Sequence, residues 1–221
     1  MYLIIVGAGS IGRRIVELAT RDHHEVVVIE ADKQTAREMA KEFECRVLHE
    51  KATEDDILKK AGIAEADALI ATTNDDAVNL TSVLIGRQYG VPRLISSVSD
   101  PDHKELFRNL TVDAVADPNR LLGEYLYRNV GEPGLSNFIQ LRGGAELGEI
   151  KLDKHSSLVG KTIMDALEAG LITNHDIVVA IYRKGELIIP RGDTQFEIGD
   201  TVTVLSKRGI SNGIYRTLQR Q

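Results

Sequence analysis

The chain has 221 residues, which suits one large or two small domains, and its 43% hydrophobic and 27% charged residues are typical of a globular protein. Its formal net charge of −6 and the lack of a long basic run exclude nucleic acid as an expected partner. Cys45 is the only cysteine, which excludes an internal disulfide, and no apolar run approaches the roughly 20 residues of a membrane span. With no signal peptide before the first apolar run, we expect a cytoplasmic protein.

The first thirty residues are typical of a strand, a glycine turn, a helix and a second strand. An apolar run at residues 2–6 leads into Gly7-Ala8-Gly9-Ser10-Ile11-Gly12, and a helical segment follows to residue 21. In this motif Gly7 allows a tight turn, Gly9 lets a pyrophosphate approach the backbone, and Gly12 lets the helix pack against the strand. The helix start offers free N–H groups to phosphates. The turn therefore predicts a nucleotide site, with a purely structural turn as the alternative.

An acid closes this motif. The second apolar run, residues 26–29, ends on Glu30, where a carboxylate would accept hydrogen bonds from ribose hydroxyls. A carboxylate at this position favours a free 2′-OH over a 2′-phosphate. Arg13 and Arg14 lie at the helix start and not after the second strand, so NAD is favoured over NADP.

The next segments alternate between helix and strand. The expected helices span residues 33–44, 53–62, 78–89 and 101–109, with Thr53 as a cap, and the expected strands span residues 46–49, 66–71, 94–96 and 112–116. This alternation predicts a parallel, doubly wound sheet with the strand order 3-2-1-4-5-6. The ligand crevice should lie at the carboxyl ends of the first and fourth strands, between the glycine turn and the polar residues 72–76.

The chain changes character after a further helix that starts at Asp117-Pro118. This helix has an apolar face, which either folds back on its own sheet or meets a neighbouring subunit, and it ends at a hinge of Gly131, Glu132, Pro133 and Gly134. Beyond it we expect strands at residues 138–141, 149–152, 177–182, 187–189 and 201–205, a hairpin turn at Lys184-Gly185 and a helix at residues 162–168. The predicted fold is therefore α/β: a Rossmann-like doubly wound domain at residues 1–134, then a small α+β domain at residues 135–221.

Several further motifs carry a resemblance to a known family. They are the glycine turn, Glu30, residues 61–68, 73–80, 90–93 and 100–103, and in the second half residues 158–162, 188–194 and 199–200. In this order they resemble the Trk/Ktr potassium-transport regulators, which are built of RCK domains. The resemblance implies a homo-oligomer in which dimers assemble into a ring. It also implies a membrane potassium transporter subunit of the TrkH or KtrB type as partner, with this chain on the inner face of the membrane.

The resemblance also supplies candidate nucleotide contacts. They are Gly7, Ala8, Gly9, Ser10, Ile11, Gly12, Glu30, Ala31, Asp32, Lys51, Ala52, Thr72, Thr73, Asn74, Asp76 and Asn79. For Asp76 and Asn79, a role at the helix start and a ligand contact stay equally open. Ser10 replaces an arginine, Asn119 an acid, and Glu50-Lys51 a Gly-Asp pair of the family. These departures favour NAD, NADH, ADP or AMP over ATP with a metal.

The expected function is therefore regulation of potassium uptake through nucleotide binding. The six histidines are scattered without metal-ligand spacing, and no nucleophile, base and acid can be placed together, so we expect neither a metal nor a catalytic residue. One alternative is an NAD-dependent oxidoreductase, which would need an acid or base beside the nicotinamide. Another is a nucleotide sensor for a different membrane transporter, such as an antiporter.

Overall fold

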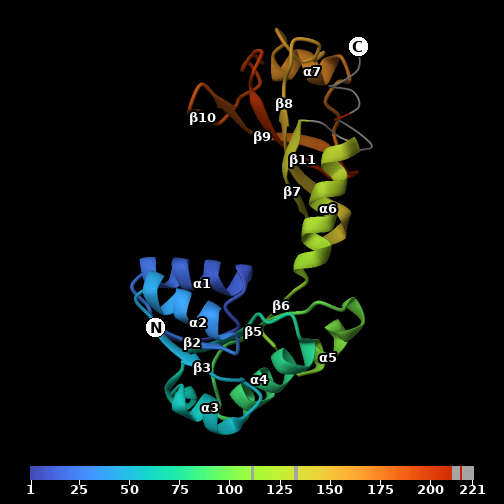
Figure 1. Cartoon of the computed structure of the whole chain (residues 1–221). Helices are drawn as coiled ribbons and strands as arrows, with labels where there is room; N and C mark the ends of the chain where they lie inside the picture. The colour runs from blue at the N-terminus through green and yellow to red at the C-terminus, as the bar shows by residue number, and fades with distance from the viewer. Residues whose placement is uncertain (111, 132–133, 211–214, 216–221) are drawn as a thin grey trace. The chain divides into compact units, whose positions relative to one another are not determined.

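The chain folds into two compact units, Met1–Leu121 and Leu122–Gln221, which we describe separately. The structure is a computed structural model that describes residues 1–110, 112–131, 134–210 and 215 (Figure 1). The two units divide inside a helix that spans residues 118–131, whereas the expected domain boundary at residue 134 lies just beyond that helix. That boundary stays a prediction.

The first unit contains a six-stranded parallel sheet. Its strands are β1 (Tyr2–Val6), β2 (Glu25–Glu30), β3 (Arg46–His49), β4 (Ala68–Ala71), β5 (Leu94–Ser97) and β6 (Ala114–Ala116). They lie in the order β3-β2-β1-β4-β5-β6, which confirms the predicted order. The chain therefore reverses its direction of winding between β1 and β4, where α/β proteins of this kind hold their ligands.

Helices cover both faces of this sheet. α1 (Ser10–Arg21) and α2 (Lys33–Glu42) lie on one face, and α3 (Asp55–Lys60), α4 (Asp76–Gln88) and α5 (Lys104–Asn109) lie on the other (Figure 1). Alternate residues of β1 point to opposite faces, so Leu3 and Ile5 join one apolar core and Ile4 and Val6 join the other. Both faces of the sheet are buried, as parallel sheets require.

Two helix starts differ from the predictions. Thr53 does not cap α3, because the residue at the N-cap is Glu54, with no hydrogen bond from its side chain. α4 begins at Asp76, two residues earlier than predicted. The side chain of Asp75 accepts the amides of Ala77 and Val78 there and satisfies N–H groups that the first turn leaves without partners.

α6 (Pro118–Gly131) begins directly after Asp117. The buried Asp117 carboxylate accepts the amide of Arg120 at 2.9 Å, as a helix cap does. Leu121, Leu122 and Leu126 are each more than half exposed, so the helix presents an apolar surface. The predicted hinge includes residues 132 and 133, which lie outside the described residues.

After α6, the described part of the second unit contains a five-stranded antiparallel sheet and a short α-helix, as the α+β prediction requires. Its strands are β7 (Leu135–Gln140), β8 (Glu146–Lys151), β9 (Asp176–Arg183), β10 (Glu186–Ile188) and β11 (Thr201–Ser206), in the order β10-β9-β11-β8-β7. α7 (Ile163–Glu168) starts at a capping box between Thr162 and Asp165. Lys184 and Gly185 both have positive φ, as the tight hairpin turn needs.

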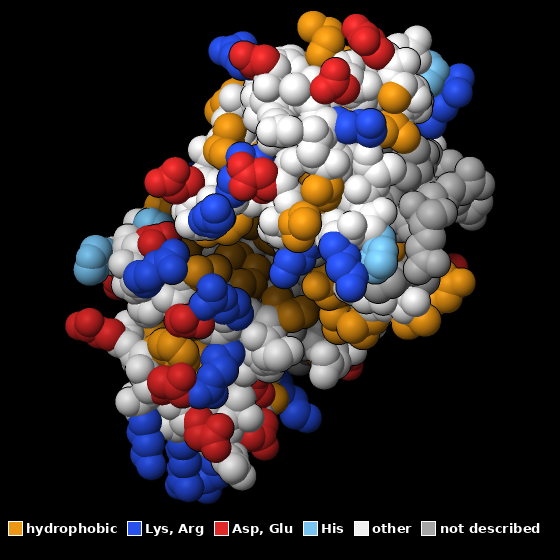
Figure 2. Space-filling model, turned by 90° about the horizontal axis from the view of Figure 1, so that it is seen from above, with side chains coloured by type: hydrophobic (Ala, Val, Ile, Leu, Met, Phe, Trp, Pro, Cys, Tyr) orange, Lys and Arg blue, Asp and Glu red, His pale blue; other side chains and the backbone are white. Residues whose placement is uncertain are grey.

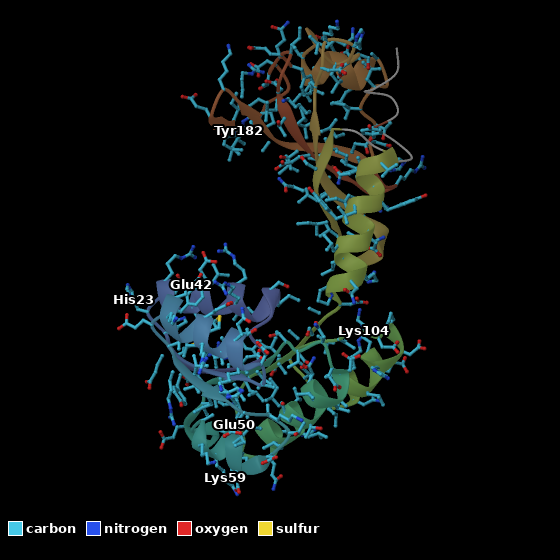
Figure 3. All side chains as sticks on the ribbon, viewed as in Figure 1. His23, Glu42, Glu50, Lys59, Lys104 and Tyr182 are labelled. Atoms are coloured by element: carbon cyan, nitrogen blue, oxygen red, sulfur yellow. The ribbon has the colours of Figure 1, made fainter. Side chains whose placement is uncertain are left out.

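The surface carries charges of both signs. Figure 2 shows lysine and arginine side chains interspersed with aspartate and glutamate on the face in view. Apolar side chains are also exposed, among them Tyr182, which projects from β9 in the second unit and is half exposed (Figure 3). Within the described residues, we find no helix with the length and apolar character that a bilayer crossing requires.

A buried ion pair connects two strands of the second unit. Asp200 precedes β11 and is fully buried, and its carboxylate accepts two hydrogen bonds of 2.8 Å from Arg183 at the end of β9. Burial raises the pKa of Asp200, but the hydrogen bonds from Arg183 and from the Glu197 amide outweigh this effect and hold it below its usual value. Arg183 also pairs with Glu197 at 2.6 Å, so removing Asp200 would leave the guanidinium one carboxylate. Removing Arg183 would leave the buried Asp200 carboxylate without its ion-pair partner.

Asp200→Ala should lower the free energy of unfolding by about 3 kcal/mol, because it removes two buried hydrogen bonds from Arg183 and one from the Glu197 amide. Urea denaturation measures this loss. The control is Asp193→Ala, which removes an exposed carboxylate from the turn before β11 and should change the free energy little. Equal effects of the two substitutions would contradict a stabilising role for the pair.

Candidate functional site

A crevice of about 680 Å³ lies at the carboxyl ends of the parallel strands in the first unit. Each of the first four strands contributes to its lining at the point where the strand ends. The lining residues are Val6, Gly7, Gly9, Ile29, Glu30, Ala31, Thr35, Glu50, Lys51, Ala52, Thr53, Thr72, Thr73, Asn74, Asp75 and Val78. The glycine turn and the polar segment after β4 thus face one crevice, at the position expected for a ligand.

The glycine turn brings three segments close together. Gly7 has a φ of 90° and a Cβ atom there would lie 2.8 Å from the side chain of Thr73. A Cβ atom on Gly12 would collide with the carbonyl group of Gly7, so only glycine allows α1 to start this close to the turn. The Thr72 hydroxyl lies 3.3 Å from the carbonyl oxygens of Val6 and Gly7, which ties the end of β4 to the turn.

Gly9 differs from its two neighbours in the motif, because a Cβ atom there would meet no atom within 4 Å. Its φ of −63° is ordinary, so backbone strain does not require glycine at this position either. Gly9 is the N-cap of α1 and lines the crevice, next to the amides that a first helical turn leaves without intrahelical partners. The open space beside these donors fits a phosphate group.

Glu30 joins the glycine turn to the start of α2. Its carboxylate oxygens accept the amide of Ala8 at 2.6 Å and the amide of Asp32 at 2.7 Å. A carboxylate has about four acceptor positions, so further donors can still bind. Glu30 therefore orders the turn and keeps acceptor capacity toward the crevice.

Nine of the predicted nucleotide contacts line the crevice. They are Gly7, Gly9, Glu30, Ala31, Lys51, Ala52, Thr72, Thr73 and Asn74. Seven other predicted contacts do not line it: Ala8, Ser10, Ile11, Gly12, Asp32, Asp76 and Asn79. Among these, Asp32 caps α2 through the amide and hydroxyl of Thr35, and these hydrogen bonds lower the pKa of Asp32.

Asp76 and Asn79 are bonded to other parts of the first unit. Asp76 accepts the amides of Ser99 and Asp100 at 2.8 and 2.9 Å, and His103 Nδ1 lies 2.9 Å from its carboxylate. Asn79 is fully buried and is bonded to Thr73 and Ser97. The structure thus places both residues beneath the crevice, where they connect α4 with its surroundings.

Several lining residues were absent from the predicted set. They are Val6, Ile29, Thr35, Glu50, Thr53, Asp75 and Val78. Glu50 lies in the loop between β3 and α3 (Figure 3). Asp75 lies in the segment 72–76 that was expected beside the crevice, and including the whole loop after β3 would also have found Glu50 and Thr53. With these residues, the lining holds three carboxylates, Glu30, Glu50 and Asp75, against the ammonium group of Lys51.

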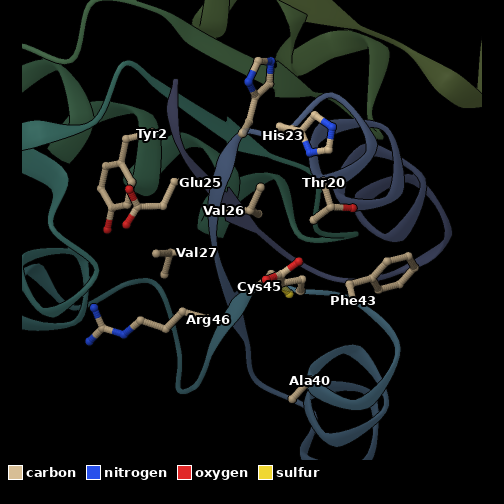
Figure 4. Close-up of a pocket in the computed structure, with 12 residues that line it drawn as sticks. Tyr2, Thr20, His23, Glu25, Val26, Val27, Ala40, Phe43, Cys45 and Arg46 are labelled. Atoms are coloured by element: carbon tan, nitrogen blue, oxygen red, sulfur yellow. The ribbon is translucent and has the colours of Figure 1, made fainter.

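A second hollow, of about 790 Å³, lies at the amino ends of β2 and β3. In Figure 4, Tyr2 and Glu25 lie on one side of it and Phe43 and Cys45 on another. The desolvation of the Cys45 thiol raises its pKa and keeps it protonated. Among the described residues, no three His, Cys, Asp or Glu side chains are placed to hold a metal ion. The hollow contains neither a glycine turn nor a helix start, so the crevice is the stronger candidate site.

The contact between Asp76 and His103 predicts a pH-dependent stability. The hydrogen bond to Asp76 raises the pKa of His103 above its ordinary value of 6.5, so folding favours the protonated imidazole. The stabilisation is fully present below pH 6.5 and is lost as the pH rises through the raised pKa. His103→Ala should therefore lower the thermal unfolding midpoint at about pH 6 and change it much less at about pH 9.

The control is His155→Ala, which removes an exposed imidazole from the second unit. Its effect on the midpoint should be similar at both pH values. A loss for His103→Ala that is as large at high pH as at low pH would contradict a charged interaction with Asp76.

Family models match both parts of the chain. The model of the TrkA-N domain matches residues 3–118, and the model of the TrkA-C domain matches residues 147–219. Two of the most similar relatives show how these parts occur together. The chain is 35% identical to a Trk system potassium uptake protein TrkA homolog of Methanothermobacter thermautotrophicus, over 94% of each chain. It is 28% identical to the Trk system potassium uptake protein TrkA of Halomonas elongata, of which it spans half the length.

Solved structures share the fold. A GsuK channel bound to NAD superposes with a TM-score of 0.69 at 20% identity, over 99% of this chain and 39% of that chain. GsuK bound to ADP superposes with a TM-score of 0.53 at 25% identity, over 58% of this chain and 34% of that chain. The relatives are potassium uptake proteins, which agrees with the expectation that the chain is not an enzyme. The two domain matches and the identity over nearly its full length show that the chain belongs to the TrkA family of Trk system potassium uptake proteins.

Proposed function

We propose that this chain is a regulatory subunit of a membrane potassium uptake system and that it binds a nucleotide in the crevice of its first unit. The observation that carries the proposal is the open space at Gly9, beside the free amides at the start of α1. Potassium uptake is the function named for its relatives. GsuK, which shares the fold, has been solved with NAD and with ADP.

Different lining residues would bind different parts of the nucleotide. Gly7, Gly9 and the first turn of α1 would hold the phosphates, and Glu30 would accept hydrogen bonds from the ribose hydroxyls. The backbone around Lys51 and Ala52 would hold the adenine ring. Thr72, Thr73 and Asn74 would hold the second half of a dinucleotide across the crevice. The nucleotide supplies binding energy and no reaction.

The charge of the crevice selects among nucleotides. Three carboxylates and one lysine give its lining a net negative charge at neutral pH. A triphosphate carries more negative charge than NAD, NADH, ADP or AMP, so its binding costs more. Ser10 also supplies no cation at the glycine turn. NAD, NADH, ADP or AMP is therefore a better ligand than ATP.

Regulation would follow from differential affinity. A nucleotide that binds one shape of the chain more tightly than another shifts the population toward that shape. The apolar face of α6 would join two copies into a dimer, because exposed apolar area of this kind marks an interaction site. Dimers would assemble further into a ring on a membrane subunit of the TrkH or KtrB type. The chain would then act from the inner face of the membrane through this partner.

The substitution Gly9→Val tests the phosphate site. A valine side chain fits sterically but would fill the space of the phosphates, so the affinity for NAD or ADP should fall below detection. Isothermal titration calorimetry measures the loss. The thermal unfolding midpoint is the control and should stay near that of the wild type, because the added atoms meet open space. Unchanged affinity would remove this turn from the site.

The double substitution Leu122→Glu and Leu126→Glu tests the assembly. Two charges on the apolar face of α6 should lower the sedimentation mass of the oligomer, because a buried unpaired charge is costly. Tyr127→Glu is the control, because Tyr127 is exposed on another side of the helix and should leave the mass unchanged.

Vesicles that contain the membrane transporter test the regulation itself. Potassium uptake should change when the wild-type chain is added, and the change should depend on the nucleotide. The double variant should lose this effect while Tyr127→Glu keeps it. A wild-type chain that leaves uptake unaltered with NAD, NADH, ADP, AMP and ATP would contradict the regulatory function.

A further inference from the structure

Asn79 lies beneath the crevice in α4 and has no exposed surface. Its side-chain oxygen accepts the amide of Thr73 at 2.9 Å and the hydroxyl of Thr73 at 2.8 Å. Its side-chain nitrogen donates to the carbonyl oxygen of Thr73 at 2.9 Å and to that of Ser97 at 3.3 Å. A buried amide with all four positions bonded is fully satisfied, so its geometry is well defined.

The two residues that Asn79 connects have different surroundings. Thr73 lines the crevice, between the glycine turn and Asn74. Ser97 is the last residue of β5, where it pairs with Ala116 at the end of β6. Asn79 therefore joins the loop after β4, which lines the crevice, to the end of the neighbouring strand β5.

The path continues from β6 into α6. The amide of Val98 donates to the carbonyl oxygen of Ala116 at 2.8 Å, and Asp117 follows directly as the cap of α6. The cap makes its bonds to the amides of Arg120 and Leu121, so the position of residue 117 sets where the helix begins.

Asp76 adds a second connection at the same junction. Its carboxylate holds the amides of Ser99 and Asp100, which follow Val98 in the loop after β5. The first turn of α4 is thus bonded to the loop before it and to the loop after β5. These segments form one hydrogen-bonded body between the crevice and β6.

We propose that Asn79 is a positioning residue that couples the occupation of the crevice to the start of α6. A nucleotide that contacts Thr73 fixes the loop after β4, and Asn79 passes this constraint to Ser97 and so to the end of β6. The first turn of α6 then becomes more ordered when the crevice is filled. This inference rests on the proposed function, because it requires a nucleotide at Thr73.

Hydrogen exchange of the full chain, with and without NAD as the probe, tests the coupling. In the wild type, NAD should slow exchange at the amides of Val98, Arg120 and Leu121 by about fivefold or more. Asn79→Ala should still bind NAD in calorimetry, with reduced affinity, but should lose this slowing. A residue that only supported the fold would lower the stability and leave the response of the remaining bound molecules intact.

Ser82→Ala is the matched control. Ser82 is also in α4 and fully buried, but its hydroxyl donates to the carbonyl of Val78 in the same helix. It should keep both the affinity and the response at α6. If Asn79→Ala does not fold, the coupling is tested with Asp76→Asn. The new side-chain amide keeps one acceptor oxygen and loses the other, so it can hold only one of the amides of Ser99 and Asp100. It should reduce the slowing at Arg120 and Leu121 by about half while NAD still binds.

The outcomes separate this inference from the proposed function. A wild-type chain that binds NAD but shows no slowing at Arg120 and Leu121 overturns the coupling alone. A folded Asn79→Ala chain that keeps the slowing also overturns it, as does an Asp76→Asn chain with the full wild-type response. A wild-type chain that binds none of NAD, ADP and AMP overturns the proposed function and this inference with it.

Discussion

The close approach of α1 to the turn after β1 is the constraint on which the first unit depends. Gly12 packs so tightly on the carbonyl group of Gly7 that no side chain fits between them. Thr72 and Thr73, which follow β4, contact the same turn at Gly7. Since backbone meets backbone at this point, the start of α1 can point its free amides into the crevice. A larger residue at either glycine would move the helix away from the ligand position.

Glu30 both orders the glycine turn and offers acceptor atoms to a ligand. Without any ligand, its carboxylate accepts the amide of Ala8 in the glycine turn and the amide of Asp32 at the start of α2. If Glu30 holds a ribose as proposed, its acceptor atoms are already oriented, which lowers the entropy lost on binding. The described part of the site offers a crevice, hydrogen-bond donors and acceptors, which fits the proposed role in binding a nucleotide.

The sequence predicted the order of the elements because each one has a local cause. The apolar runs, the glycine turn and the alternation with amphipathic helices determine a parallel sheet and its switch point. Asn79 shows the limit of this reasoning. Its type and its place in the first turn of α4 are compatible with both ligand contact and burial. In the structure it is buried and bonded to Ser97, which belongs to another strand. Contacts over such distances depend on packing that no local pattern reveals. The same holds for Thr53, whose residue type suits a cap although the helix begins after Glu54.

The two separate cores of the first unit have a consequence for how such chains diverge. Leu3 and Ile5 contact one set of helices, and Ile4 and Val6 contact the other. The backbone of the sheet is the partition between these sets, so a change in volume on one side is best compensated by a neighbour on that side. Over evolutionary time, the apolar residues of one core can therefore be substituted independently of those in the other core. Glu30 and Thr72, at the strand ends, are hydrogen-bonded to the glycine turn, so they belong to neither core and are held in place while the cores change.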